Sequence, residues 1–132
     1  MVAAIHCQGF AQTAGDKILG EWLSAQKDAR FLIYKQGAKY DGKIVWGTGH
    51  TNYDTENPDP KLRARELIGL AILNDFVYDG DNTWTDGTIY DPKQGKTYAC
   101  KLTLTGNQQL KVRGYVGISM FGRTEYWTRV KN

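Results

Sequence analysis

The sequence predicts an all-β protein, a single eight-stranded antiparallel up-and-down barrel. The chain has 132 residues, which is the length of one domain. From Gly15 onward, turn-forming residues recur at intervals of roughly ten residues, the spacing of short strands joined by tight turns. Between the turns, apolar and polar side chains alternate, as they do in strands with one buried face. About eight strands in succession can close a barrel that holds one small ligand.

The expected strands lie at residues 18–25, 29–36, 39–48, 67–78, 83–91, 96–105, 109–118 and 123–130. Alternation in the seventh strand separates two sets of side chains, namely Leu110, Val112, Gly114 and Val116 on one face and Lys111, Arg113 and Tyr115 on the other. The first set inside would mean an apolar or filled barrel. The second set inside would mean a pocket with polar tips, and the sequence leaves this choice open.

The segment 49–66 interrupts the meander, because its two prolines exclude a central strand. We expect it to lie over one end of the barrel. A long connection of this kind serves either as a lid over a binding site or as a strap that packs on the barrel, and both interpretations stay open. Asp59 is placed to pair with Arg63 or Arg65 and so fix the segment to the rim.

Residues 1–15 contain no Lys, Arg, Asp or Glu. A stretch of this kind ending in small residues three apart is typical of the end of a secretory signal peptide, with cleavage before Gln12. The alternative is an N-terminal arm that packs on the domain formed by 16–132. On the first interpretation the protein is periplasmic or secreted, and the one remaining cysteine, Cys100, has no internal disulfide partner.

The composition, with 41% hydrophobic and 23% charged residues, is that of a globular protein. No apolar run approaches the roughly 18 residues that span a bilayer. A stacking platform for nucleic acid would use Arg113, Tyr115, Arg123 and Trp127. The net charge of only +3 argues against such a partner, so we expect no nucleic acid to bind. The oligomeric state is left open.

Candidate catalytic groups are few. His50 and Cys100 could form a base and nucleophile, but Cys100 stands in mid-strand, where cysteine usually acts as a small buried hydrophobic residue. No Gly-x-Ser-x-Gly, His-Glu-x-x-His or phosphate-loop motif occurs. The acidic turn at 79–82 lacks the later glycine and glutamate of a calcium loop. We expect no catalytic residue, no metal and no cofactor.

The first and last strands carry a pattern that resembles the lipocalins and the wider calycin group. Gly20 and Trp22 form a Gly-x-Trp on the first strand, and Arg129 ends the last. In those proteins the tryptophan packs under a basic residue from the last strand and closes the barrel. The resemblance therefore implies a buried Trp22 in contact with Arg129, where a guanidinium can stack on the indole and bond to free carbonyls.

Longer motifs occur throughout 16–131, among them GEW (20–22), GKIVW (42–46), NPDP (57–60), IYDPKQGKTY (89–98), VRGYVG (112–117) and GRTEYWTRV (122–130). In these segments the chain is similar to an uncharacterised family of small secreted bacterial proteins. That resemblance implies a lipocalin-like barrel and an envelope location, without an assigned reaction or ligand. Members often carry a cysteine pair before the IVW strand; this chain has none there, so no disulfide is implied.

The function we predict is non-enzymatic binding of a small, mainly apolar ligand in the barrel mouth. The expected binding residues are Trp46, Tyr90, Tyr98, Arg113 and Tyr115. Their aromatic rings would form apolar walls, and Arg113 would pair with an acidic head group. The main alternative is a filled barrel that acts through its surface as an envelope interaction module. A third possibility is an enzyme that uses His50 or Cys100.

Overall fold

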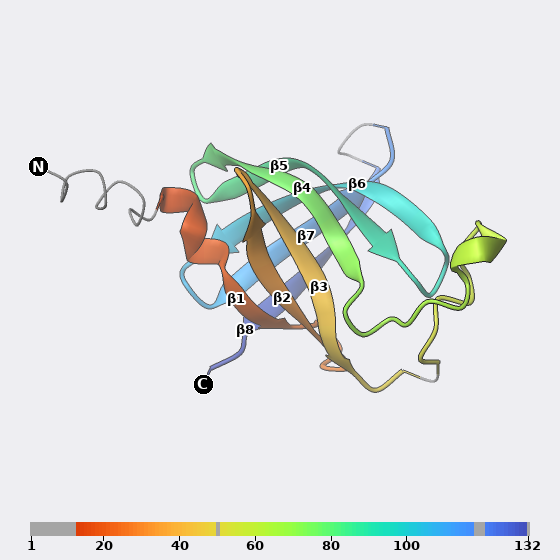
Figure 1. Ribbon diagram of the computed structural model, residues 1–132. Coiled ribbons are helices and arrows are strands. Elements are labelled where there is room, and N and C mark those ends of the chain that lie inside the picture. Colours follow the sequence, from red (N-terminus) through yellow and green to blue (C-terminus); the bar gives the residue numbers. More distant parts are fainter. Residues whose placement is uncertain (1–12, 50, 118–120, 132) are drawn as a thin grey trace, which may run out of the picture.

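The computed structural model describes residues 13–49, 51–117 and 121–131. They form a closed antiparallel barrel in which each strand pairs with the next and β8 returns to β1 (Figure 1). The strands are β1 (Gly20–Leu23), β2 (Ala29–Gln36), β3 (Lys39–Gly47), β4 (Ala71–Gly80), β5 (Thr83–Asp91), β6 (Lys96–Thr105), β7 (Gln109–Tyr115) and β8 (Gly122–Arg129). Two 3-10 helices are η1 (Ala14–Ile18) and η2 (Pro60–Leu62). The predicted eight-stranded up-and-down barrel is confirmed.

The starts of two strands differ from the prediction. The segment expected as strand 18–25 begins with the last residue of η1, and β4 starts only at Ala71 instead of at residue 67. Gly69 has a φ of 92°, and the backbone N–H of Leu70 donates to the Leu67 carbonyl at 3.0 Å. The stretch 67–70 is therefore a turn. Its sequence pattern resembles that of a strand because Leu67 and Leu70 pack against the barrel core, as the apolar residues of β4 do.

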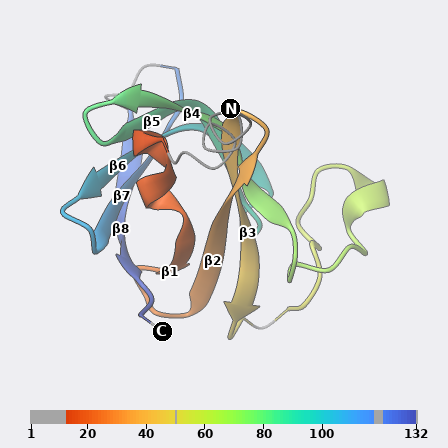
Figure 2. The ribbon, with the colours of Figure 1, turned by 60° about the vertical axis from the view of Figure 1, so that its left-hand side comes forward.

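η1 covers one end of the barrel (Figure 2), and the interior of this end is filled by side chains. Large side chains fill it, among them Trp22, Phe76, Trp84, Leu102, Leu104 and Leu110, each at most 3% exposed. The two indoles also anchor η1. Trp22 donates its indole N–H to the Ile18 carbonyl at 3.0 Å, and Trp84 donates to the Gly15 carbonyl at 3.2 Å. Buried indole nitrogens thus find partners without leaving an unpaired donor in the core.

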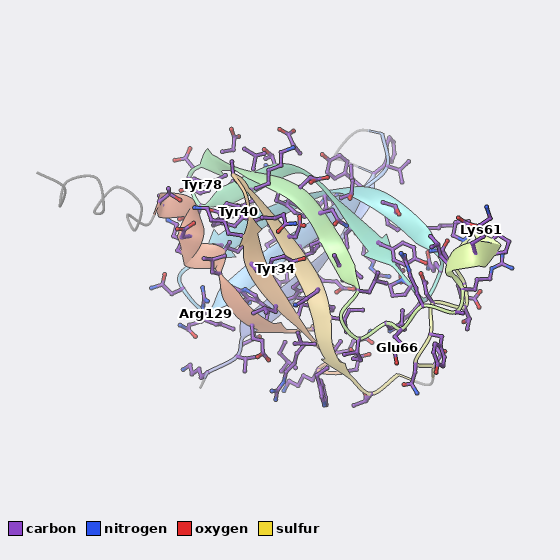
Figure 3. The ribbon with its side chains drawn as sticks, in the orientation of Figure 1. Tyr34, Tyr40, Lys61, Glu66, Tyr78 and Arg129 are labelled. Atoms are coloured by element: carbon purple, nitrogen blue, oxygen red, sulfur yellow. The ribbon has the colours of Figure 1, made fainter. Side chains whose placement is uncertain are left out.

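Arg129 seals the same end, together with Trp22 and Gly20. Its guanidinium lies 4.3 Å from the centroid of the Trp22 ring. It also donates to three backbone carbonyls, those of Lys17 (2.6 Å), Leu19 (2.9 Å) and Asn107 (2.7 Å). A Cβ at Gly20 would come within 3.2 Å of Arg129 Nη1, on a backbone with a φ of 122°. Figure 3 shows Arg129 at the end of the barrel that η1 covers.

The structure decides which face of β7 points inward. Leu110 and Val112 are buried, and Gly114 continues their face toward the open end. Lys111 and Arg113 alternate with them and point outward. The interior is therefore lined by the apolar set, because burying a guanidinium in the wall of a barrel without a partner would carry a large desolvation cost.

The N-terminal leader prediction falls on residues 1–12, which lie outside the described residues. Ala14 and Gly15 belong to η1 and so to the closed end of the barrel. Among the described residues, no helix has the length and apolar character needed to cross a membrane.

Candidate functional site

The end of the barrel opposite η1 is hollow. A cavity of about 1020 Å³ opens there, between the β1–β2, β5–β6 and β7–β8 connections and the long β3–β4 connection. Its apolar wall comes from six side chains on six different strands: Phe31, Ile44, Ile72, Ile89, Val112 and Trp127. Small-molecule sites typically have volumes of about 300–1,000 Å³ and largely apolar walls. The barrel is therefore solid at one end and hollow at the other, and a barrel filled along its whole length is not what forms.

An aromatic stack forms part of the cavity wall. The rings of Phe31 and Trp127 lie nearly parallel, with centroids 4.2 Å apart and an angle of 18° between them. Trp127 is only 2% exposed, although it lines the cavity. Its indole N–H donates to Glu125 Oε1 at 3.2 Å. The stacking on Phe31 and the hydrogen bond to Glu125 hold the Trp127 ring in place, so this part of the cavity wall is preformed.

A charged pair lies at the cavity mouth, on the inward face of β8. Arg123, Glu125 and Trp127 stand at every second position of the strand and so share one face, and all three border the cavity. Arg123 Nη2 lies 2.7 Å from Glu125 Oε2. The hydrogen bond and the charge of Glu125 raise the pKa of Arg123 above its ordinary value, so the guanidinium stays charged. Glu125 is the carboxylate that receives bonds from both neighbours.

The three predicted tyrosines border the cavity, although from different faces. Tyr98 is on the inward face of β6, and its hydroxyl donates to Gln94 Oε1 at 3.0 Å. Tyr115 belongs to the outward set of β7 but stands at the end of the strand, where it forms part of the rim. Tyr90 is outward-facing on β5 and is buried beneath the long connection. The structure thus gathers these three rings around one opening.

The other two predicted binding residues, Trp46 and Arg113, lie away from the cavity, which corrects the prediction for both. Arg113 points outward from β7, and its Nη1 donates to Thr124 Oγ1 on β8 at 3.1 Å. Trp46 is 40% exposed on the outer surface, where the guanidinium of Arg30 lies 5.3 Å from its ring. A bulge in the β2–β3 pairing at Arg30 and Phe31 changes the register beside Trp46. Because a one-residue change in register reverses a side chain's face, the sequence pattern misplaced this residue.

The deepest lining residues escaped the sequence analysis. Val112 was recognised only as a member of an alternating strand, Phe31 was not singled out, and Ile72 lies in an apolar run whose period is unclear. Glu125 and Arg123 could have been found, because they stand at every second position before Arg129, which closes the barrel from the inside. Residues at every second position of a strand share one face, and this spacing was the available signal for a polar group facing the cavity.

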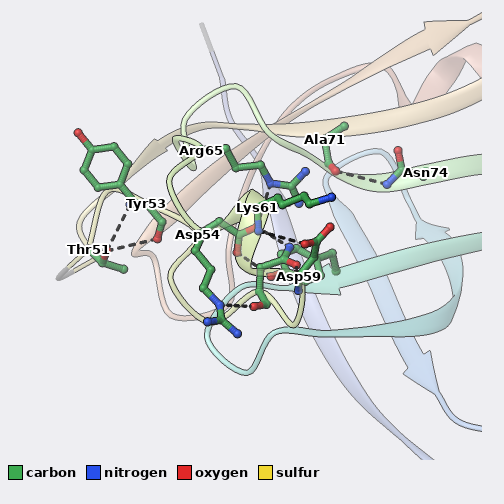
Figure 4. A network of polar contacts seen from close by, with 11 residues as sticks. Thr51, Tyr53, Asp54, Asp59, Lys61, Arg65, Ala71 and Asn74 are labelled. Atoms are coloured by element: carbon green, nitrogen blue, oxygen red, sulfur yellow. Dashed lines mark hydrogen bonds and ion pairs between the residues drawn. The ribbon is translucent and has the colours of Figure 1, made fainter.

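The long connection is fastened by a buried carboxylate (Figure 4). Asp54 has no exposed surface, and it accepts three hydrogen bonds: from the hydroxyl of Tyr90 (2.6 Å), from Asn57 Nδ2 (2.8 Å) and from Arg65 Nε (2.9 Å). The expected pairing of Asp59 with Arg63 or Arg65 is wrong. Asp59 instead accepts from the Lys61 backbone at the start of η2, at 3.0 Å. Arg65 therefore pairs with Asp54, which lies against the barrel wall, and not with Asp59, which is closer to it in sequence.

The charges of this network follow from its hydrogen bonds. Burial alone would raise the pKa of Asp54, but the bonds from Tyr90, Asn57 and Arg65 outweigh it and hold this pKa below its ordinary value. Burial, together with the bond to Asp54, raises the pKa of Tyr90 to about 12. Tyr90 therefore acts as a neutral donor to a carboxylate, and it joins the barrel wall to the segment that borders the cavity.

The proposed catalytic pair gains no support from the structure. Cys100 is 1% exposed on the inward face of β6, and burial raises the pKa of its thiol to about 12. At neutral pH it is a thiol, which is a poor nucleophile. His50 lies outside the described residues. Within the described part of the chain, no group of three or more His, Cys, Asp or Glu side chains is arranged to hold a metal ion.

Comparison with known proteins gives the family. A family model described as an uncharacterized protein conserved in bacteria, DUF2147, matches residues 20–129. The chain belongs to the DUF2147 family. No curated protein matches this DUF2147 chain. Among solved structures, protein HP1028 from Helicobacter pylori, described as belonging to the lipocalin family, matches with a TM-score of 0.79 and 21% identity. The match covers 86% of this chain and 83% of that one, and it shows a common lipocalin-like fold.

Proposed function

We propose that this DUF2147 protein binds a small, mainly apolar ligand in its barrel cavity and does so without catalysis. The observation that carries the proposal is the cavity itself, about 1020 Å³ with an aromatic and aliphatic wall that reaches solvent at one end. An apolar ligand gains roughly 25 cal/mol for each Å² of surface that it removes from water. Because the wall is preformed, few side chains lose conformational freedom on binding, and most of that free energy contributes to affinity.

The structural neighbour supports this proposal only through its fold, since eight-stranded barrels of this kind can enclose one ligand. An interaction module that acts through its outer surface would need no hollow interior. An enzyme would need a reactive group in the cavity, and the buried thiol of Cys100 does not supply one. Binding is the function that uses this cavity.

A substitution at Gly114 tests the proposal. Gly114 faces the cavity from β7 without a positive φ, and a Cβ there would meet Ile89 Cγ2 at 3.5 Å, an ordinary contact. Gly114→Leu should therefore fold and fill part of the cavity. Binding of a neutral probe such as dodecanol is followed through the intrinsic tryptophan fluorescence, to which Trp127 contributes from the cavity wall. We expect the wild-type signal to titrate with dodecanol and the Gly114→Leu signal to change at least tenfold less steeply, consistent with steric loss of apolar contact.

Ala99→Leu is the matched control, because Ala99 is exposed on the outer face of β6 and receives the same leucine side chain away from the cavity. It should bind as the wild type does. Native mass spectrometry of protein purified from its own host would reveal a ligand that co-purifies. An empty cavity that takes up neither dodecanol nor a hydrophobic dye would contradict the proposal.

We also propose that the protein is exported and works in the periplasm or outside the cell. The support is the charge-free start of the sequence with its small residues before Gln12. A binder of apolar molecules in the envelope would carry them through water between membranes, where their own solubility is low.

A further inference from the structure

We propose that the ligand carries a cationic group, so that the cavity selects a protonated aliphatic amine over a carboxylate of the same chain length. This inference rests on the proposed binding function and names the class of ligand. It reverses the acidic head group expected from the sequence. Three observations lead to it: the balance of charge at the mouth, the placement of Glu125, and the aromatic rings of the wall.

The charges that line the cavity are unequal. Among the described lining residues, four carboxylates, those of Asp28, Glu56, Asp91 and Glu125, face two cations, Lys93 and Arg123. Each cation already lies near an acid. Lys93 Nζ is 3.6 Å from Asp28 Oδ2, and Arg123 is bonded to Glu125. The mouth thus carries an excess of negative charge, although the whole chain has a formal charge of +3. A low-dielectric cleft with one prevailing sign attracts ligands of the opposite sign.

Glu125 places one of these carboxylates inside the barrel. On the inward face of β8, Glu125 is the next residue after Trp127 in the direction of the cavity mouth. It pairs in register with Val112, a residue of the apolar wall. Oε1 accepts the Trp127 indole N–H and Oε2 accepts from Arg123, so the side chain has a fixed position beside the apolar wall. A carboxylate can accept more than these two bonds, because its oxygens offer about four lone-pair sites. An ammonium group at the mouth would reach it while its alkyl chain lies along Phe31 and Trp127.

The remaining polar features favour the same charge. Tyr98, Tyr115 and Trp127 border the cavity, and aromatic rings attract cations through their quadrupole. Arg113, the residue that would have received an acidic head group, lies on the outer face. Among the described lining residues the one arginine, Arg123, is engaged with Glu125, so an anionic ligand would have to compete with that carboxylate.

The test compares three probes with the same dodecyl chain: dodecylamine, dodecanol and dodecanoate. At pH 7 the amine is protonated and the acid is ionised, by analogy with the side-chain amine and carboxyl groups, whose pKa values are about 10.4 and 4.3. Dissociation constants are measured through the intrinsic tryptophan fluorescence, with each probe kept below its critical aggregation concentration. We expect the amine to bind at least about tenfold more tightly than dodecanoate at low ionic strength, with dodecanol between them. This preference should shrink in high salt, which screens the charges at the mouth.

Two substitutions locate the preference and one serves as a control. Glu125→Gln should remove most of the preference for the amine, whereas Arg123→Gln should increase it. Glu66→Gln removes the same charge from the exposed part of the long connection, away from the cavity lining, and should leave the preference unchanged (Figure 3).

The wild-type comparison decides the inference even if a variant fails to fold. Equal affinity for all three probes, or tightest binding of dodecanoate, would overturn the selection of a cation while leaving the binding function in place. Failure of all three probes to bind would instead overturn the binding function itself. A preference for the amine that Glu125→Gln leaves intact would show that this carboxylate does not create it.

Discussion

Trp22 and Arg129 show how two residues at opposite ends of the domain's sequence fix one end of the barrel. The indole is fully buried, and the guanidinium covers it while bonding to three carbonyls that have no strand partner. The two side chains stabilise each other. The ring gives the cation a stacking surface, and the cation shields the ring from water.

Truncation of Trp22 should be costly for this reason. We expect Trp22→Ala to reduce the free energy of unfolding by about 3–5 kcal/mol, because it leaves a large cavity in the solid end and removes the surface on which Arg129 stacks. Trp46→Ala is the control, since this ring is 40% exposed and its contact with Arg30 is worth roughly 0.5–1 kcal/mol at the surface. Urea unfolding of both variants measures the difference, and similar losses would contradict the closure role.

At the scale of the elements, the long connection behaves as a fastened strap that also forms one side of the cavity mouth. Of the two roles left open by its prolines, the described contacts support both. Asp54 ties it to Tyr90 of β5, while Thr55 and Glu56 border the cavity. Tyr90 is outward-facing on β5, so this network adds no charge to the apolar side chains of the inner wall.

The Asp54 network predicts how this element responds to substitution and to acid. Asp54→Asn leaves one carbonyl oxygen for three donors, and we expect it to lower the free energy of unfolding by about 1–3 kcal/mol and to expose the segment to protease. Asp59→Asn is the control, since asparagine caps η2 as well as aspartate does.

The pKa of Asp54 is lower in the folded protein than its ordinary value of 3.8. The stability that this ionised group contributes is therefore present above that value and is lost as the pH falls below it, toward the folded pKa. In Asp54→Asn this part of the acid dependence should be missing. An unchanged acid profile, or equal protease sensitivity of the two variants, would mean that the network does not hold the strap.

For the whole molecule, the barrel divides its interior into a solid half that supplies stability and a hollow half that supplies the site. A bound ligand should stabilise the fold by mass action, by about 2.7 kcal/mol when its concentration is 100 times the dissociation constant. This linkage gives the binding experiments a second readout in the melting temperature.

The proposed export makes a prediction at this scale as well. Mass spectrometry of the mature protein from its native host should give an N-terminus at Gln12, because signal peptidase cleaves after small residues spaced as they are here. A protein that retains Met1 and fractionates with the cytoplasm would overturn the export proposal, but it would leave the barrel and its cavity unaffected.

Local patterns were sufficient to predict the barrel. Strand order and the up-and-down connections follow from turn spacing and from alternation, which act over a few residues. The contact between the first and last strands was instead implied by the resemblance of Trp22 and Arg129 to the lipocalin pattern. The site was predicted only in part. Tyr90, Tyr98 and Tyr115 border the cavity, and their role in binding stays a prediction. Trp46 and Arg113 were misplaced, and Glu125 was not found.

The sequence by itself determined which residues alternate, but not which alternating set faces inward. Both sets of β7 contain groups that could line a pocket, and only the pairing of β7 with β6 and β8 places Gly114 opposite Cys100 and Val112 opposite Glu125. The bulge beside Phe31 and the pairing of Asp54 with Tyr90, 36 positions away, likewise depend on contacts between distant segments. A side chain's face is set by register, and register is decided where strands meet, so the cavity and its charge belong to the tertiary structure alone.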